Sequence, residues 1–144
     1  MPDPQPQPTV DPVTAQQPEV LRFLTALHPY DAMAPADLAR LSTRFKTCHY
    51  RKGQQIYQLG EQMAGLYLIH QGQVEVRDQN DVQISLLGLR NSFGERGLLQ
   101  QGLAVTSARA LCDTELLLLP AAAFHQLRAE DEGARRLFDR GRPR

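Results

Sequence analysis

Apolar and polar residues repeat with two different periods along the chain, and the change of period divides it into three parts. In the first part, apolar residues recur every three or four positions: Val20, Leu21, Leu24 and Leu27, and then Leu38, Leu41 and Phe45. This spacing predicts two amphipathic helices, over residues 18–28 and 35–46. Pro18 suits a first helical position, and Pro29 ends the first helix.

The middle part, from about residue 47 to residue 119, alternates apolar and polar residues in short runs. The alternation predicts seven strands: 47–51, 55–58, 66–70, 73–77, 82–87, 105–111 and 115–119. Turn-forming pairs such as Lys52-Gly53 and Gln71-Gly72 separate them. Many short strands without long helices between them indicate a sandwich or barrel, and argue against a doubly wound sheet.

Helical character returns after Pro120, where three alanines precede apolar residues at helical spacing. The whole pattern therefore predicts a mainly β fold with flanking helices. Its centre would be a β sandwich or barrel, preceded by two helices and followed by one or two C-terminal helices.

The two ends of the chain differ from this central part. Residues 1–17 contain five prolines separated mostly by polar residues, and we expect a disordered tail because so little apolar surface cannot offset the entropy of ordering. A proline-rich docking peptide is less favoured, because the spacing is PxP rather than PxxP. Residues 141–144 are expected to form a basic tail, which leaves residues 18–140 as one folded domain.

Composition excludes several classes of protein. The 144 residues include 16 lysines and arginines and 16 aspartates and glutamates. This balance argues against a protein that binds nucleic acid through a generally basic surface. No apolar run reaches the ~20 residues of a membrane helix, and the polar N-terminus lacks a secretory signal, so we expect a cytoplasmic protein without a membrane partner. Cys48 and Cys112 form no CxxC pair and are expected to be buried, reduced thiols.

No catalytic or metal-binding pattern is present in the sequence. The four histidines lack the HxH or HExxH spacing of metal ligands, and Ser107 does not belong to a GxSxG nucleophile motif. We therefore expect neither an enzyme nor a resident metal or cofactor.

The segment 87–110 carries the strongest functional signal. Within it, Phe93-Gly94-Glu95-Arg96-Gly97 is expected to open a short helical turn. Gly94 lets the backbone approach a ligand closely, and the first N–H groups of such a turn favour an anion. Glu95 alone repels an anion, so a ribose hydroxyl beside a phosphate suits both features. Alternatively, Glu95 caps its own turn.

Other motifs lie in a fixed order around this turn. Residues 50–56 form an opening strand and glycine turn, residues 66–76 (LYLIHQGQVEV) form a hairpin, and residues 113–124 form a leucine-rich strand followed by a helix. Together with Phe93-Gly94-Glu95, this ordered set resembles the cyclic-nucleotide-binding domain family over roughly residues 24–127. The resemblance implies an antiparallel β jelly-roll (a double-stranded β-helix) with flanking helices, which senses a cyclic nucleotide. Phe93-Gly94-Glu95 would open its phosphate-binding cassette.

The resemblance also implies a role for individual residues. Glu95 would accept a hydrogen bond from the ribose 2′-hydroxyl, and the backbone of residues 94–97 would lie along the sugar-phosphate. Ala104 stands where the family has the arginine that pairs with the cyclic phosphate. The implied nucleotide-binding residues are Phe93, Gly94, Glu95, Arg96, Gly97, Ala104, Val105 and Ser107.

The missing arginine lowers the affinity that the resemblance would otherwise imply. A hydrogen bond to a charged group contributes about 1.5–3 kcal/mol, and a charge enclosed without its partner costs about 3–5 kcal/mol. At ~1.4 kcal/mol per tenfold change, cyclic AMP or cyclic GMP would bind more weakly by orders of magnitude. Arg96 and Arg109 are the two candidates to replace the absent cation.

Two functions are consistent with these features. The first is a regulatory, sensory module of bacterial signal transduction, in which a weakly bound small anionic nucleotide shifts the C-terminal helix. The second is a ligand-free module on the same fold, which forms a homodimer or docks a downstream signalling partner.

The segments around the cassette refine the resemblance. Crp/Fnr-type regulators place a helix-turn-helix after the last helix, and none follows here, so direct DNA binding is not expected. The sequence of the cassette and of the leucine-rich strand after it resembles the N-terminal sensor of certain bacterial signalling proteins. Those proteins also carry CBS domains and a nucleotidyltransferase-like region.

Overall fold

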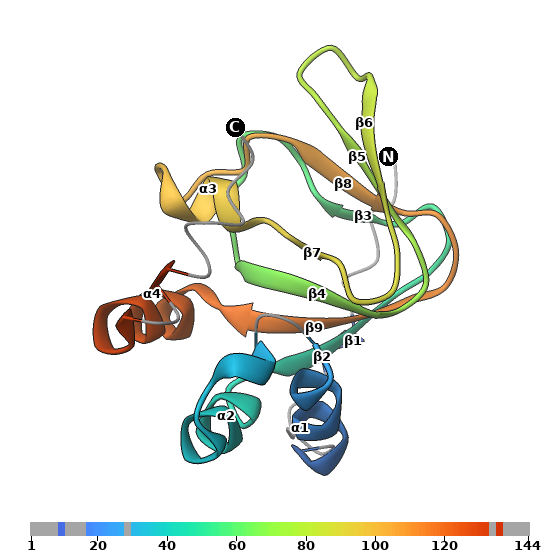
Figure 1. The fold of residues 1–144 in the computed structure, drawn as a ribbon. Coiled ribbons are helices and arrows are strands. Elements are labelled where there is room, and N and C mark those ends of the chain that lie inside the picture. The colour runs from blue at the N-terminus through green and yellow to red at the C-terminus, as the bar shows by residue number, and fades with distance from the viewer. Residues whose placement is uncertain (1–8, 11–16, 28–29, 133–134, 137–144) are drawn as a thin grey trace.

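The computed structural model describes residues 9–10, 17–27, 30–132 and 135–136, and its centre is formed by two antiparallel sheets (Figure 1). The first sheet has the strand order β1-β2-β9-β4-β7, and the second has the order β3-β8-β5-β6. The strands are β1 (Thr9–Val10), β2 (Lys46–Tyr50), β3 (Gln55–Tyr57), β4 (Gly65–Gln71), β5 (Val74–Arg77), β6 (Gln83–Leu87), β7 (Ser92–Phe93), β8 (Ser107–Ala110) and β9 (Thr114–Pro120). This arrangement confirms the predicted jelly-roll.

Helices flank the first sheet on the side away from the second. Figure 1 shows α1 and α2 beneath β2 and β9, and α4 beside the end of β9. The helical elements are α1 (Gln17–Thr25), the single 3-10 turn η1 (Tyr30–Ala32), α2 (Pro35–Ser42), α3 (Glu95–Leu99) and α4 (Ala121–Glu130). None of the described helices has the length and apolar character needed to cross a bilayer.

The leucine run of β9 lies at the centre of the core. All four leucines at positions 116–119 are buried, although alternation along a strand would leave every second side chain outside. Both faces of this strand are covered, because the second sheet lies on one side and the helices on the other. A strand buried on both faces is continuously apolar in sequence, as this one is.

The second predicted helix ends four residues earlier than expected. The backbone N–H of Thr43 donates to the carbonyl oxygen of Arg40 at 3.2 Å, and that of Arg44 donates to the carbonyl of Leu41 at 2.9 Å. The Thr43 hydroxyl also donates to the Arg40 carbonyl at 2.7 Å. Phe45 nevertheless packs in the core, with 1% of its surface exposed. The apolar spacing continues to Phe45 because the segment between α2 and β2 also places a side chain in the core.

The N-terminal segment and one cysteine also differ from expectation. Within the expected tail, Thr9–Val10 pair with His49 and Cys48 of β2, because the edge of that strand offers unpaired backbone groups. Most of that tail, and the expected basic tail at residues 141–144, lie outside the described residues. Both thiols are free; burial raises the pKa of Cys48 to about 11, whereas Cys112 is only half-buried.

Gly65 provides a test of the close packing between β4 and β9. A Cβ atom on Gly65 would lie 2.0 Å from the carbonyl oxygen of Leu119, whereas a Cβ on Gly88 would meet nothing within 4 Å. We expect Gly65→Ala to lower the free energy of unfolding by about 2–3 kcal/mol or more in urea titrations. The matched control Gly88→Ala should change it by less than ~0.5 kcal/mol. Equal effects of the two substitutions would contradict this packing.

Candidate nucleotide-binding site

A cavity of about 220 Å³ lies against the α3 turn, and strands β3, β5, β6 and β7 and residues 104–106 contribute to its walls. It brings together seven of the eight residues that the sequence singled out: Phe93, Gly94, Glu95, Arg96, Gly97, Ala104 and Val105. The remaining residue, Ser107, lies elsewhere. Apolar side chains from distant strands, such as Val76 and Leu87, complete the walls.

One wall of the cavity belongs to a stack of aromatic rings. The rings of Tyr67 and Phe93 are stacked with their centroids 5.1 Å apart, and the ring of Tyr57 lies 6.1 Å from that of Phe93. Tyr57 and Phe93 line the cavity directly. Burial raises the pKa of Tyr57, and raises that of Tyr67 to about 12, so both phenols are neutral near physiological pH. The wall therefore offers flat, uncharged surface to a ligand.

Two glycines set the close approach of α3 to the rest of the site. Gly94, the residue that precedes α3, has a φ of 96°, which an L side chain rarely adopts. A Cβ on Gly97 would lie 2.6 Å from the carbonyl oxygen of Leu103. The Gly97 carbonyl also accepts a 2.8 Å hydrogen bond from the N–H of Gly102. The predicted short turn at Glu95 is thus confirmed and held against residues 102–104.

Glu95 is the acidic group of the cavity wall. Its Oε2 atom is buried and has no hydrogen-bond partner among the described residues. Burial raises the pKa of this carboxyl, and a hydrogen bond to the backbone of Glu95 itself partly offsets that rise. This bond agrees with the capping role considered from the sequence. It leaves Oε2 free to accept a hydrogen bond from a ligand.

Ala104 occupies the position that the resemblance assigns to an arginine. It is buried, with 4% of its surface exposed. Its N–H donates to the carbonyl of Glu61 at 2.8 Å, and its carbonyl accepts from the N–H of Gly60 at 2.8 Å. The position is therefore fixed by backbone pairing and presents only a methyl group to the cavity.

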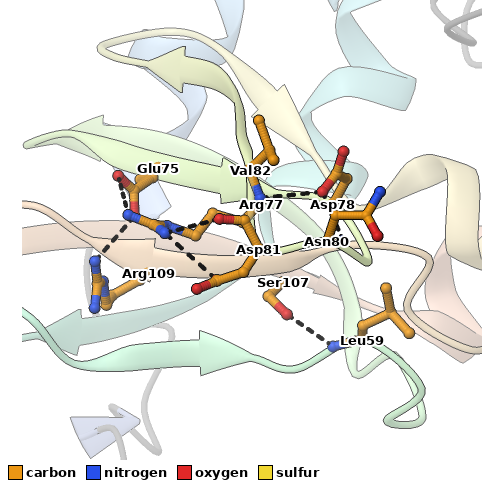
Figure 2. Close-up of polar contacts among 9 residues, drawn as sticks. All are labelled: Leu59, Glu75, Arg77, Asp78, Asn80, Asp81, Val82, Ser107 and Arg109. Carbon is orange, nitrogen blue, oxygen red and sulfur yellow. Dashed lines mark hydrogen bonds and ion pairs between the residues drawn. The ribbon is translucent and has the colours of Figure 1, made fainter.

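Arg109, one of the two candidates to replace the missing cation, lies on the opposite face of the second sheet. Figure 2 shows Arg77 and Arg109 on either side of Glu75. Arg109 donates to Glu75 Oε1 at 3.0 Å and Arg77 donates to the same oxygen at 2.6 Å, and the hydrogen bond from Arg77 chiefly holds the pKa of Glu75 below its usual value. Arg109 thus serves a surface ion-pair network outside the cavity.

Ser107 also lies on that outer face. Its hydroxyl accepts a 3.1 Å hydrogen bond from the N–H of Leu59, and it borders a separate hollow beside Arg77 and Arg109 (Figure 2). Thr106 lines the cavity instead of Ser107, and its side chain is hydrogen-bonded to Tyr57. Counting every second residue from Ala104 would have selected Thr106, because alternate residues of an extended segment share a face.

Comparison with known proteins agrees with this arrangement. The profile of the family described as "Cyclic nucleotide-binding domain" matches residues 47–131. The chain belongs to this family. The domain's described residues contain no group of three or more histidine, cysteine or acidic side chains that could hold a metal ion.

The relatives of the domain include channels and regulators. It is 32% identical over 100 residues to the potassium voltage-gated channel unc-103 of Caenorhabditis elegans, covering 67% of this chain and 12% of the channel. It is 32% identical over 94 residues to the cyclic AMP receptor protein of Thermus thermophilus, covering 62% of this chain and 44% of that protein. The chain therefore matches less than half of either relative.

A solved structure shares the fold. The regulatory domain of Toxoplasma gondii PKA, crystallised with cAMP, superposes with a TM-score of 0.79 at 16% identity, covering 89% of this chain and 50% of that one. This likeness shows that the two chains share a fold.

The buried carboxyl of Glu95 predicts a pH-dependent stability difference. Because the folded pKa lies above the ordinary value of 4.5, the unfolded chain ionises first as the pH rises, and the folded state loses stability up to its own pKa. We expect Glu95→Gln to unfold with about 1 kcal/mol more free energy than wild type at neutral pH, because a neutral amide is less costly to bury.

Urea titrations at several pH values measure this difference. It should vanish below about pH 3, where the carboxyl is protonated in both states. The control Glu19→Gln, at an exposed position on α1, should shift stability by less than ~0.5 kcal/mol throughout. A less stable Glu95→Gln protein at neutral pH would mean that the carboxylate has a favourable partner in the folded state.

Proposed function

We propose that this chain is a non-enzymatic sensory domain that holds a small ligand in the cavity beside α3 and transmits its occupancy to α4. The observation that carries the proposal is the convergence of the Phe93–Gly97 turn and residues 104–106 on one cavity, although these segments are separate in sequence. Its setting would be cytoplasmic bacterial signal transduction, without direct contact to DNA or membrane. The family relationship supports a regulatory role.

A cyclic nucleotide is the ligand class that the family indicates, and this domain is expected to bind it weakly. The cavity offers a methyl group at Ala104 where a phosphate needs a cation, and Arg109 is occupied by Glu75 on the other face. Arg96 is the one basic residue of the cavity wall. Without a second cation, cyclic AMP or cyclic GMP would lose most of its charge-assisted bonding.

The start of α4 is tied to the cavity wall by a short path. β9 ends at Pro120 and α4 begins at Ala121, with no linker between them. The N–H of Ala121 donates to the carbonyl oxygen of Ala64 at 2.9 Å, and Ala64 follows Met63, which lines the cavity. A ligand that displaces Met63 therefore acts on the first turn of α4 through one peptide unit. Differential binding to two positions of α4 would be the switch.

A ligand-free interaction module is the second candidate, and one surface favours it. Strand β6 lies at the edge of the second sheet, and four large apolar residues in or beside it are at least half exposed: Val82, Ile84, Leu86 and Leu89. An edge strand with exposed apolar side chains is suited to pair with another molecule. Such a module would act as a homodimer or dock a signalling partner.

Isothermal titration of the purified chain with cyclic AMP and cyclic GMP distinguishes these candidates. We expect weak binding by the wild type, and binding about 10–100-fold tighter by Ala104→Arg, because the new guanidinium would add a charge-assisted bond of about 1.5–3 kcal/mol. An Ala104→Arg protein that folds normally but binds no more tightly would place the phosphate somewhere other than beside residue 104.

Hydrogen exchange followed by mass spectrometry tests the coupling to α4. Ligand at saturating concentration should change the exchange of amides in residues 121–130 at least several-fold, while α1, which does not line the cavity, serves as an internal reference. Unchanged exchange across α4 in a chain that binds ligand would refute the coupling.

A further inference from the structure

The charges of the cavity wall indicate which ligand the site can accept. Among the residues that line the cavity, Glu95 and Arg96 alone carry charged side chains. Arg96 follows Glu95 directly in α3, and consecutive helical residues project about 100° apart. The two side chains therefore do not face the same point, and no ion pair joins them in the described part of the chain. A ligand meets the acid and the base separately.

Glu95 can accept a further hydrogen bond, beyond the one from its own backbone. Its Oε2 atom is buried without a partner among the described residues, and the neighbouring phenol of Tyr57 is instead hydrogen-bonded to Thr106. The terminal torsion of a glutamate is broad, so either carboxylate oxygen can turn towards the cavity. A ligand hydroxyl or N–H would satisfy the carboxylate, whereas an anion would be repelled by it.

Residues 104–106 of the cavity wall carry no charged group that could neutralise a phosphate. Residues 104–106 contribute a methyl group, an isopropyl group and a hydroxyl group. The backbone N–H of Ala104 is already bonded to Glu61, so it is not free to bind an anion. An enclosed phosphate would therefore keep most of its desolvation cost here.

The remaining walls favour an uncharged ring. Apolar and aromatic side chains such as Phe93, Val76 and Leu87 form most of the lining. The volume of about 220 Å³ is below the ~300–1,000 Å³ of common ligand pockets, which favours the smaller of two related ligands.

We propose that the cavity binds an uncharged, hydroxyl-bearing ligand of nucleoside size and discriminates against the same compound carrying a cyclic phosphate. The inference rests on the proposed sensory function, and it names the ligand class of that site. The ligand's hydroxyl donates to Glu95, and its ring lies against the apolar walls. Charge selects the ligand, because residues 104–106 supply no cation to pair with a phosphate.

The test compares adenosine and guanosine with cyclic AMP and cyclic GMP by isothermal titration on the full chain. In the wild type, at least one nucleoside should bind about tenfold or more tighter than its cyclic phosphate. Ala104→Arg should reverse this order, because it supplies the missing cation. Urea unfolding of each variant confirms that it folds before binding is compared.

The contact with Glu95 is tested by a double-mutant cycle with the ligand. Removing the hydroxyl, by using 2′-deoxyadenosine, should weaken binding to the wild type about tenfold, as should Glu95→Gln with adenosine. Combined, the two changes should cost little more than either alone, because both act on one hydrogen bond: the deoxynucleoside lacks the donor, and the glutamine amide removes the charge from the acceptor. Glu19→Gln, at an exposed position on α1, should leave adenosine binding unchanged.

The outcomes separate this inference from the function on which it rests. Tighter binding of the cyclic phosphates by the wild type would overturn the inference and leave the sensory function intact. Additive losses in the double-mutant cycle would also overturn it, since the hydroxyl would then bond elsewhere. If none of the four compounds binds to either the wild type or Ala104→Arg, the sensory function fails and the inference fails with it.

Discussion

Burial of β9 on both faces is the constraint on which the other elements depend. Leucines 116–119 need apolar cover from the second sheet on one side and from the helices on the other. β2 and β4 pair with β9 along its two edges, so the register of this one strand positions both neighbours. β4 in turn carries Tyr67, whose ring supports the wall of the cavity, and α4 begins where β9 ends. The site and the helix that would respond to it are built on the same strand.

Much of this architecture could be predicted from the period of apolar residues. The seven strands expected from alternation correspond to β2 to β6, β8 and β9, because each spans enough residues to show a period. β1 and β7 contain two residues each, and a pair of residues has no period. The predicted end of α2 was too late because the apolar period continues beyond the helix. Phe45 continued the helical spacing after the hydrogen bonds of Thr43 had ended the helix.

The residues of the candidate site also divide into those that the sequence could identify and those that it could not. The Phe93–Gly97 turn is contiguous, so its glycines and acid could be recognised in the sequence. Val76 and Leu87 line the cavity only because β5 and β6 pair and place them on one face, and no local pattern marks them. Ser107 and Arg109 differ from Thr106 by the face they occupy, which depends on the register of β8 against β5. Ordering of motifs locates a site, but strand register decides which side chains enter it.

The pairing of Thr9–Val10 with β2 has a practical meaning for the ends of the first sheet. β2 would otherwise form that sheet's outer margin, with a row of unsatisfied amide and carbonyl groups. A two-residue cover is short, and its loss frees a template to which any extended peptide can add. Removing the residues up to Val10 would therefore expose β2 as an edge strand. Self-association of such a truncated protein would reflect that exposed backbone rather than a natural assembly.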